Sequence, residues 1–296
     1  MIFAKKDHLV GLDIGSSFIK VAELKATGNG LALHKFGMAR IAPGTIVEGR
    51  VMDMEGLAND IQALFKSQKI REKNVAISTG GHSVVIKTIN MAMRPEKELH
   101  DMIFSEAEQY IPYDIDDVNI DYQVLGESEF SPDQVSVLLV AVKKDLVAEY
   151  IDLIQMAGLN PRIIDVDTFA LQNAYEILPY GNQEKITLLI DVGASKTSLN
   201  IVKAKVSLMM RDTVLGANQV IEALSEQLEI SVEDAQDALN GDLEGIVSAD
   251  DLERISVRVA QSWCSEICEV VNTFQSGAND ERVEKILLSG GGVFVE

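Results

Sequence analysis

The sequence is poor in cysteine, in aromatic residues and in positive charge. Its 296 residues include two cysteines, one tryptophan and 26 lysines and arginines against 46 aspartates and glutamates, so the formal net charge is −20. Two cysteines supply no disulfide framework, which is typical of proteins in a reducing compartment. The excess of acid disfavours a broad basic face for nucleic acid or anionic lipid, and it favours neutral or basic protein partners.

Long apolar runs and a leader pattern are missing too. The longest apolar run, Val137 to Val142, is far too short to span a bilayer. The start, MIFAKKDHLV, lacks the apolar segment and cleavage site of a secretory signal, so we expect no signal peptide. Cys264 and Cys268 lie four positions apart on a predicted helix and could supply two metal ligands, but no nearby His or Cys completes a set. We therefore predict that both are core thiols.

The overall composition is that of a globular protein. Apolar residues make up 47% of the chain and charged residues 24%, which is ordinary for a folded, water-exposed domain. The length exceeds the usual size of a single core, so we expect at least two domains.

The most informative stretch is LLIDVGASKTSLNIV, from Leu188 to Val202. A hydrophobic strand ends in Asp191, and Gly193 permits a tight turn where a side chain would block a phosphate. The segment LVGLDIGSSFIKVAEL, from Leu9 to Leu24, repeats this pattern near the start of the chain. The matching positions, which indicate an internal duplication, are Asp13 with Asp191, Gly15 with Gly193 and Ser17 with Ser195.

The chemistry of the two segments points to a phosphate chain. Backbone N–H groups in a small-residue turn form an anion-binding concavity, and an acid at a strand end holds Mg²⁺ directly or through water. Two such acids that face each other would need a cation between them. The pair therefore predicts two jaws around one phosphate chain, whereas either motif alone is also compatible with a β-hairpin that has a polar turn.

Periodicity gives an α/β layout with a change of rhythm at Pro95. The predicted strands are 31–41, 74–78, 84–91, 118–125, 135–142, 163–166, 188–190 and 206–212. The predicted helices are 56–69, 96–110, 145–157, 167–177, 217–228, 232–239 and a long one capped by Ser248, with Trp263 on its buried stripe. A helix, two strands and a helix after Pro95 predict an inserted module, and the acids at 114, 116, 117 and 121 within it lack calcium-loop spacing, which favours solvated loop acids.

A third loop closes the pattern. The stretch KILLSGGGVFV, from Lys285 to Val295, predicts a strand that ends in Ser289 and three glycines. Glycines at this place let the backbone approach a flat or phosphorylated ligand closely. A glycine triplet alone is weak evidence, but it gains weight after two acid–glycine turns.

The three loops, in this order, resemble the phosphate 1, phosphate 2 and adenosine motifs of the actin, Hsp70 and sugar-kinase superfamily. Within it the chain resembles the PilM family of type IV pilus assembly proteins, relatives of FtsA. The segments that carry this likeness are PGTIVEGRVMD (43–53), ELHDMIFSEAEQYIP (98–112), VNIDYQVL (118–125), AGL (157–159), DVDTFAL (165–171) and RDTVLGAN (211–218).

The resemblance implies a duplicated two-domain actin-like, or ribonuclease H-like, α/β fold with a small inserted α+β subdomain. The expected division is 1–94 for the first domain, 95–161 for the insert, 162–180 for the return and connecting helix, and 181–296 for the second domain. Family members continue past the adenosine motif, so we expect this chain to be shortened at its C-terminal side. They also present Glu and Lys to the adenosine where this chain has Gln236 and Leu239, which predicts weaker ribose contacts.

By the same resemblance the ligands are ATP and Mg²⁺. Asp13 and Asp191 would organise the metal through water. The nucleotide-binding set would be Asp13, Gly15, Ser16, Ser17, Lys20, Asp191, Gly193, Ala194, Ser195, Lys196, Thr197, Gly216, Asn218, Gly290, Gly291 and Gly292. For hydrolysis a residue must position water, and Asp165, Asp167 and Gln172 are the candidates; we expect slow or absent turnover and assign no catalytic residue.

The resemblance also implies a partner, the short cytoplasmic tail of a PilN-like inner-membrane protein. It would bind a groove beside strand 84–91 and helix 98–110, with Val84, Val85, Ile86, Ile103 and Ala107 as groove residues. The chain would then be a cytoplasmic scaffold held at the inner membrane by its partner, and other pilus platform proteins are further possible partners. The alternatives are an FtsA-like filament-forming protein and a small-molecule kinase of the same superfamily.

Overall fold

The computed structural model describes residues 8–28, 30–81, 83–128, 131–178, 184–241, 245–277 and 281–294. The chain forms two compact units. The first comprises Met1–Ile14 and Phe18–Val166, and the second comprises Gly15–Ser17 and Asp167–Glu296. Each unit is described by itself below.

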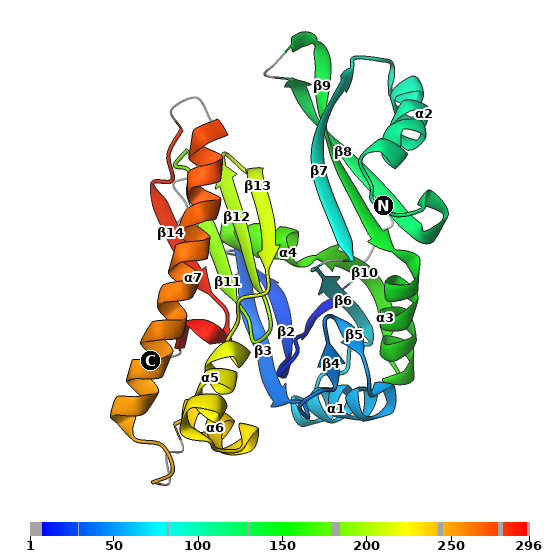
Figure 1. The fold of residues 1–296 in the computed structure, drawn as a ribbon. Helices are drawn as coiled ribbons and strands as arrows, with labels where there is room; N and C mark the ends of the chain where they lie inside the picture. Colours follow the sequence, from blue (N-terminus) through cyan, green and yellow to red (C-terminus); the bar gives the residue numbers. More distant parts are fainter. Residues whose placement is uncertain are drawn as a thin grey trace. The chain divides into compact units, whose positions relative to one another are not determined.

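The first unit is built on a five-stranded sheet (Figure 1). Its strands are β1 (Val10–Ile14), β2 (Phe18–Thr27), β3 (Gly30–Arg40), β6 (Asn74–Thr79) and β10 (Asn160–Val166), in the order β10-β6-β1-β2-β3. β1 pairs antiparallel with β2 and parallel with β6, so the C-terminal end of β1, with Asp13, enters the turn at Gly15–Ser17.

Two helices cover one face of this sheet. They are α1 (Met54–Ser67) and α3 (Lys144–Met156), and the short strands β4 (Ile46–Val47) and β5 (Arg50–Val51) precede α1. The Asp53 carboxylate accepts the Gly56 N–H at 2.9 Å and so caps α1. The buried side of α1 packs with α3 and with the inward side chains of β1 and β2 in one core.

A second, three-stranded sheet in the same unit has the order β7-β9-β8. Its elements are β7 (Val84–Ala92), α2 (Glu96–Glu106), the 3₁₀ turns η1 (Ala107–Gln109) and η2 (Ile115–Asp117), β8 (Val118–Ser128) and β9 (Ser131–Lys143). All pairings in it are antiparallel, and α2 packs on one face over Val137 and Leu139. The sheet predicted for the inserted module therefore also contains β7. The second helix predicted for that module, α3, packs instead in the core of the five-stranded sheet.

The second unit repeats the strand arrangement of the first. Its sheet has the order β13-β12-β11-β14, with β11 (Thr187–Val192), β12 (Thr197–Lys203), β13 (Val206–Thr213) and β14 (Lys285–Ser289). β11 is antiparallel to β12 and parallel to β14, as β1 is to β2 and β6. The internal duplication predicted from the two acid–glycine turns is thus present in the strand pairing.

Helices cover both faces of this second sheet. They are α4 (Asp167–Ile177), α5 (Asn218–Leu228), α6 (Val232–Leu239) and α7 (Ala249–Gly277), and the 3₁₀ turn η3 (Gly291–Phe294) follows β14. Leu188 and Ile190 face the core formed with α5, α6 and α7, whereas Leu189 faces Tyr175 of α4. Burial on both faces explains why β11 reads as a continuous apolar run rather than an alternating one.

Most predicted elements are confirmed with small shifts of their ends. The helices 167–177 and 232–239 are confirmed at both ends, and Ser248 caps α7 by accepting the Asp251 N–H at 3.1 Å. Trp263 is in the core, at 7% exposure. The predicted helix 96–110 instead ends at Glu106 and continues as η1. Residues 129 and 130, between the predicted strands 118–125 and 135–142, and Val295 lie outside the described residues.

The prediction of core thiols is wrong. Cys264 and Cys268 are both exposed. Only one side of α7 packs on the sheet, through Ile255, Trp263 and Val270, and the two cysteines project from the other side because they fall outside that helical stripe.

Candidate functional site

The turn between β11 and β12 leaves backbone donors available. The Gly193 N–H donates to the Lys196 carbonyl at 2.9 Å and closes the turn. The Ala194 and Ser195 N–H groups donate to no backbone carbonyl within the described part of the chain. A Cβ on Gly193 would lie 2.8 Å from the Lys196 oxygen, so the tight form of this turn requires glycine.

The start of α5 is hydrogen-bonded to the same turn. The Asn218 N–H donates to the Ala194 carbonyl at 2.8 Å, and the Ala217 N–H donates to the Gly193 carbonyl at 3.1 Å. A Cβ on Gly216 would lie 2.4 Å from the Ala194 oxygen. The sequence therefore brings Gly216 and Asn218 to the phosphate-type turn as predicted, and backbone contact holds them there.

The glycine triplet lies against the end of β11. Gly290 has φ +91°, and a Cβ on it would lie 2.2 Å from the Val192 oxygen. A Cβ on Gly292 would lie 2.5 Å from Cγ1 of Val192, whereas one on Gly291 would meet nothing within 4 Å. Three loops that are distant in sequence thus converge on the C-terminal end of β11.

Asp191 lies at this convergence on β11. Its Oδ1 accepts a hydrogen bond from the Ser289 hydroxyl at 2.8 Å, and the parallel register pairs Asp191 with Ser289 directly. The serine thus holds one of the two carboxylate oxygens in place. Sequence reasoning had found Ser289 only as the end of a strand.

Lys196 is held by two carboxylates rather than left free. Its Nζ lies 2.6 Å from Oδ2 of Asp167 and 3.4 Å from Oδ2 of Asp212. Burial lowers the pKa of Lys196, but Asp167 and Asp212 more than offset this, so the pKa is raised above its ordinary value. The sequence did not reveal that Asp167 and Asp212 pair with Lys196, because no motif of fixed spacing links α4 or β13 to the turn.

Thr197 has a structural contact. Its side chain is buried and its hydroxyl donates to the Leu215 carbonyl at 2.9 Å. This bond ties β12 to the segment before α5. Because the hydroxyl donates its single hydrogen to Leu215, it has none left to donate to a phosphate oxygen.

In the first unit, Asp13 has a cationic neighbour. Lys20 Nζ donates to Oδ2 of Asp13 at 2.7 Å, since the two residues face each other across the β1–β2 pair. Gly15–Ser17 groups with the second unit, and there the Ser16 hydroxyl donates to the Ser195 hydroxyl at 2.9 Å.

Leu239, one of the two departures in the expected adenosine wall, has a packing role. It contacts the core under α5 to α7. Gln236 lies one turn earlier on α6 and is half-buried. The core contact accounts for a leucine where the resemblance implies a charged residue.

The predicted partner groove needs a correction. Ile103 of α2 and Ala107 of η1 are fully buried, and Val85 packs toward the same core, so none of them lines an open groove. Strand alternation explains this, because Val84 and Ile86 point to the opposite face of the sheet from Val85.

That opposite face is a half-buried apolar surface. Ile86 pairs with Val140, and Leu138 is two residues along β9 on the same face. All three are partly exposed, and they belong to none of the described buried cores. We call Val84, Ile86, Leu138 and Val140 the open sheet face.

The comparisons with known proteins decide the family. The sequence model of the family described as type IV pilus assembly protein PilM matches residues 11–296. The chain belongs to the PilM family. A solved structure of a PilM–PilN type IV pilus biogenesis complex matches with 26% identity and a TM-score of 0.83, covering 98% of this chain and 83% of that one.

More distant structures share the fold of this PilM-family chain. The ethanolamine utilization protein EutJ from Carboxydothermus hydrogenoformans is 13% identical, with a TM-score of 0.56 and coverage of 98% and 78%. MreB5 of Spiroplasma citri bound to ADP is also 13% identical, with a TM-score of 0.51 and coverage of 98% and 86%. The α/β fold is the duplicated actin-like one that the sequence predicts.

Proposed function

We propose that this PilM-family chain is an ATP-binding actin-like scaffold of the type IV pilus inner-membrane assembly platform. The observation that carries the nucleotide half of the proposal is the convergence of three glycine turns and Asp191 at the end of β11. Such a site offers backbone donors and close backbone approach, which suit phosphates and a flat base.

The residues present fit Mg-ATP. Ala194 and Ser195 would donate backbone N–H groups to phosphate, and Gly290 to Gly292 would lie under the base. Asp191 would orient the metal through its second carboxylate oxygen. Asp13 would do the same from the first turn, once Lys20 turns to a phosphate or to solvent. The bound nucleotide would supply charge and binding energy that stabilise this arrangement.

The water-positioning candidates support binding with slow or absent hydrolysis. The Asp167 carboxylate holds Lys196, and the Gln172 amide oxygen accepts from Ser207 and from Asn200. Oδ1 of Asp165 accepts the Val166 N–H at 2.8 Å. Each group is already engaged in a contact, and none of them is held solely for an attacking water.

The open sheet face supports the partner half of the proposal. An extended peptide could lie on Ile86, Leu138 and Val140 or add to the free edge of β7, which pairs only with β9 in the described sheet. We propose that the tail of a PilN-like inner-membrane protein binds there. The matching solved structure is a PilM–PilN complex, which supports this class of partner.

This partner would place the chain in the cytoplasm at the inner membrane. None of the helices in the described residues is both long and apolar enough to cross a bilayer. Under the proposal the chain is attached to the membrane through its partner.

Calorimetric titration with Mg-ATP, and then with the tail peptide of a PilN-like protein, tests both halves. We expect micromolar nucleotide binding, which corresponds to about 8 kcal/mol, and little phosphate release. Absence of heat with Mg-ATP would overturn the nucleotide half. Absence of peptide binding both with and without nucleotide would overturn the partner half.

A further inference from the structure

The loop after α1 carries the densest cluster of positive charge in this acidic chain. Residues 66–73, KSQKIREK, hold Lys66, Lys69, Arg71 and Lys73 against the single acid Glu72. All four cations are exposed, and none forms an ion pair within the described residues. In a chain of net charge −20, four neighbouring cations that form no ion pair in the described residues are unusual and suggest a binding role.

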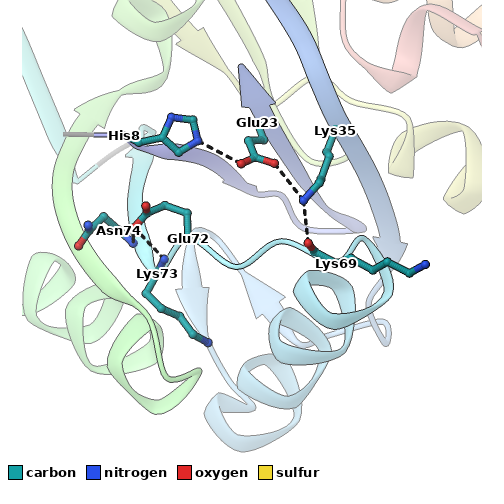
Figure 2. Close-up of polar contacts among 7 residues, drawn as sticks. All are labelled: His8, Glu23, Lys35, Lys69, Glu72, Lys73 and Asn74. Carbon is teal, nitrogen blue, oxygen red and sulfur yellow. Dashed lines mark hydrogen bonds and ion pairs between the residues drawn. The ribbon is translucent and has the colours of Figure 1, made fainter. Parts of the chain in front are cut away.

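The acid in the loop is already engaged. Oε1 of Glu72 accepts the N–H groups of Lys73 and Asn74, each at 2.9 Å. Figure 2 shows this contact, with the Lys69 and Lys73 ammonium groups ending away from it. The nearby Lys35 differs, because its Nζ contacts Glu23 at 3.2 Å and donates to the Lys69 carbonyl at 2.7 Å (Figure 2).

Two of these cations border a cavity between the C-terminal ends of α1 and α3. Its volume is about 680 Å³. Lys66 and Lys73 line it together with Asn59 and Gln62, and no Asp or Glu does. Acids outnumber bases by 46 to 26 in the whole sequence, so a cavity with two lysines and no acid stands apart from the rest of the molecule.

The floor of the cavity is apolar. Phe65, Ile70 and Leu159 line it beside the polar rim. The interaction of a lysine with the negative end of a helix would explain Lys66, which lies in the last turn of α1. It does not explain Lys69, Arg71 and Lys73, which follow the helix.

We infer that the cavity between α1 and α3, which Lys66 and Lys73 line, forms with the neighbouring Lys69 and Arg71 a docking site for an acidic segment of a partner protein. The segment carries an apolar side chain that enters the cavity while its carboxylates meet the four cations. A protein segment suits the site better than a lipid surface, because the apolar residues Phe65, Ile70 and Leu159 line a cavity and do not project from the surface.

This site is separate from the two surfaces of the proposed function. It lies beyond the C-terminal end of α1, whereas the open sheet face is formed by β7 and β9. The inference therefore stands or falls independently of nucleotide binding and of the PilN-like tail.

Fluorescence anisotropy on the full chain tests the site with synthetic probes. The first probe is a short fluorescein-labelled peptide in which glutamates surround one leucine. The second replaces the glutamates with glutamines, and the third replaces the leucine with serine. We expect the first to bind with an affinity that falls as salt rises, the second to lose binding, and the third to bind more weakly.

Paired variants locate the binding. Lys66→Gln with Lys73→Gln should weaken binding of the first peptide roughly tenfold or more. The matched control is Lys25→Gln with Lys97→Gln, which removes the same charge at two exposed lysines that form no ion pair in the described chain, and it should bind like the native chain.

Four results would overturn the inference. The first is native affinity in the Lys66/Lys73 variant, and the second is no binding of the acidic peptide at millimolar concentration. The third is a dimer in sedimentation that this variant dissociates, because the occupant would then be a second copy. The fourth is binding to phosphatidylglycerol vesicles that depends on the same lysines while the peptide does not bind.

Discussion

The ammonium group of Lys196 lies 2.6 Å from the carboxylate of Asp167, the first residue of α4. The contact joins the phosphate-type turn of the second unit to the helix that begins that unit. Asp212, at 3.4 Å, completes a triad with two acids and one base. Under the proposed function, a phosphate that attracted Lys196 would have to compete with two carboxylates, which would couple nucleotide binding to the position of α4.

Replacing Lys196 should lower the stability of the protein, because Asp167 and Asp212 would lose the cation between them. Lys196→Met is expected to destabilise the protein by about 1–3 kcal/mol, because Asp167 and Asp212 would be left half-buried and facing each other. Urea unfolding measures this change. Asp167→Asn in the Lys196→Met background should restore part of it, and an additive double mutant would contradict the coupling.

The raised pKa of Lys196 predicts that the protein loses stability at alkaline pH. Because its pKa is raised in the folded protein, Lys196 stabilises the fold below its unfolded pKa, and this contribution is lost as pH rises through the folded pKa. Unfolding free energies measured between about pH 9 and 12 should therefore fall more steeply for the native chain than for Lys196→Met. Parallel curves for the two proteins would argue against the shift.

Gly290 should not tolerate a side chain. Its φ is +91° and a Cβ would lie 2.2 Å from the Val192 oxygen, so Gly290→Ala is expected to cost about 1–3 kcal/mol and to weaken Mg-ATP binding. Gly291→Ala is the matched control, since its Cβ would meet nothing within 4 Å. Equal stability and equal nucleotide affinity of the two variants would refute a close approach of this turn to β11.

The open sheet face should respond to charge. Ile86→Asp is expected to reduce capture of the PilN-like tail at least roughly tenfold with little loss of stability, because Ile86 is only half-buried. Val124→Asp, on the exposed part of β8, is the control. Ile103→Asp should behave differently and unfold the β7-β9-β8 subdomain, because Ile103 is fully buried. Pull-down with the tail peptide and thermal unfolding separate these effects.

The lowered pKa of Glu23 predicts that the protein loses stability at acid pH. Burial raises the pKa of Glu23, but hydrogen bonds from His8 and Lys35 outweigh this and hold the pKa below its ordinary value (Figure 2). The carboxylate then stabilises the fold above its unfolded pKa of 4.5, and that stability is lost as pH falls through the folded pKa. In Glu23→Gln the unfolding free energy should depend less on pH between about pH 3 and 5. An unchanged pH dependence would contradict this contribution of Glu23.

Much of the fold and of the candidate site could be predicted because the signals are local. A strand that ends in an acid and a glycine, as at Asp191 and Gly193, specifies its turn within a few residues. The repetition at Asp13 and Gly15 then specifies the duplication. Gly290 was found as part of a glycine triplet, a local signal for close backbone approach, whereas Gly216 came from the family resemblance.

The misses have a common cause in packing. Cys264 and Cys268 look like core residues by type, but only one side of α7 is covered, and the helical phase places them on the other. Ile103, Ala107 and Val85 were assigned to a groove, whereas α2 buries them against β9. Whether a side chain is buried depends on which element packs over it, and the residues of its own segment do not specify that element.

The sequence by itself determined the element types, the two acid–glycine turns and the family, because these depend on residue order within short windows. Only the tertiary structure decided the partners of Lys196, the face of β7 that stays open and the cavity in which Lys66 and Lys73 lie beside Leu159. Those are contacts between segments far apart in the chain, and they arise when apolar faces pack and bring charged side chains together or leave them alone.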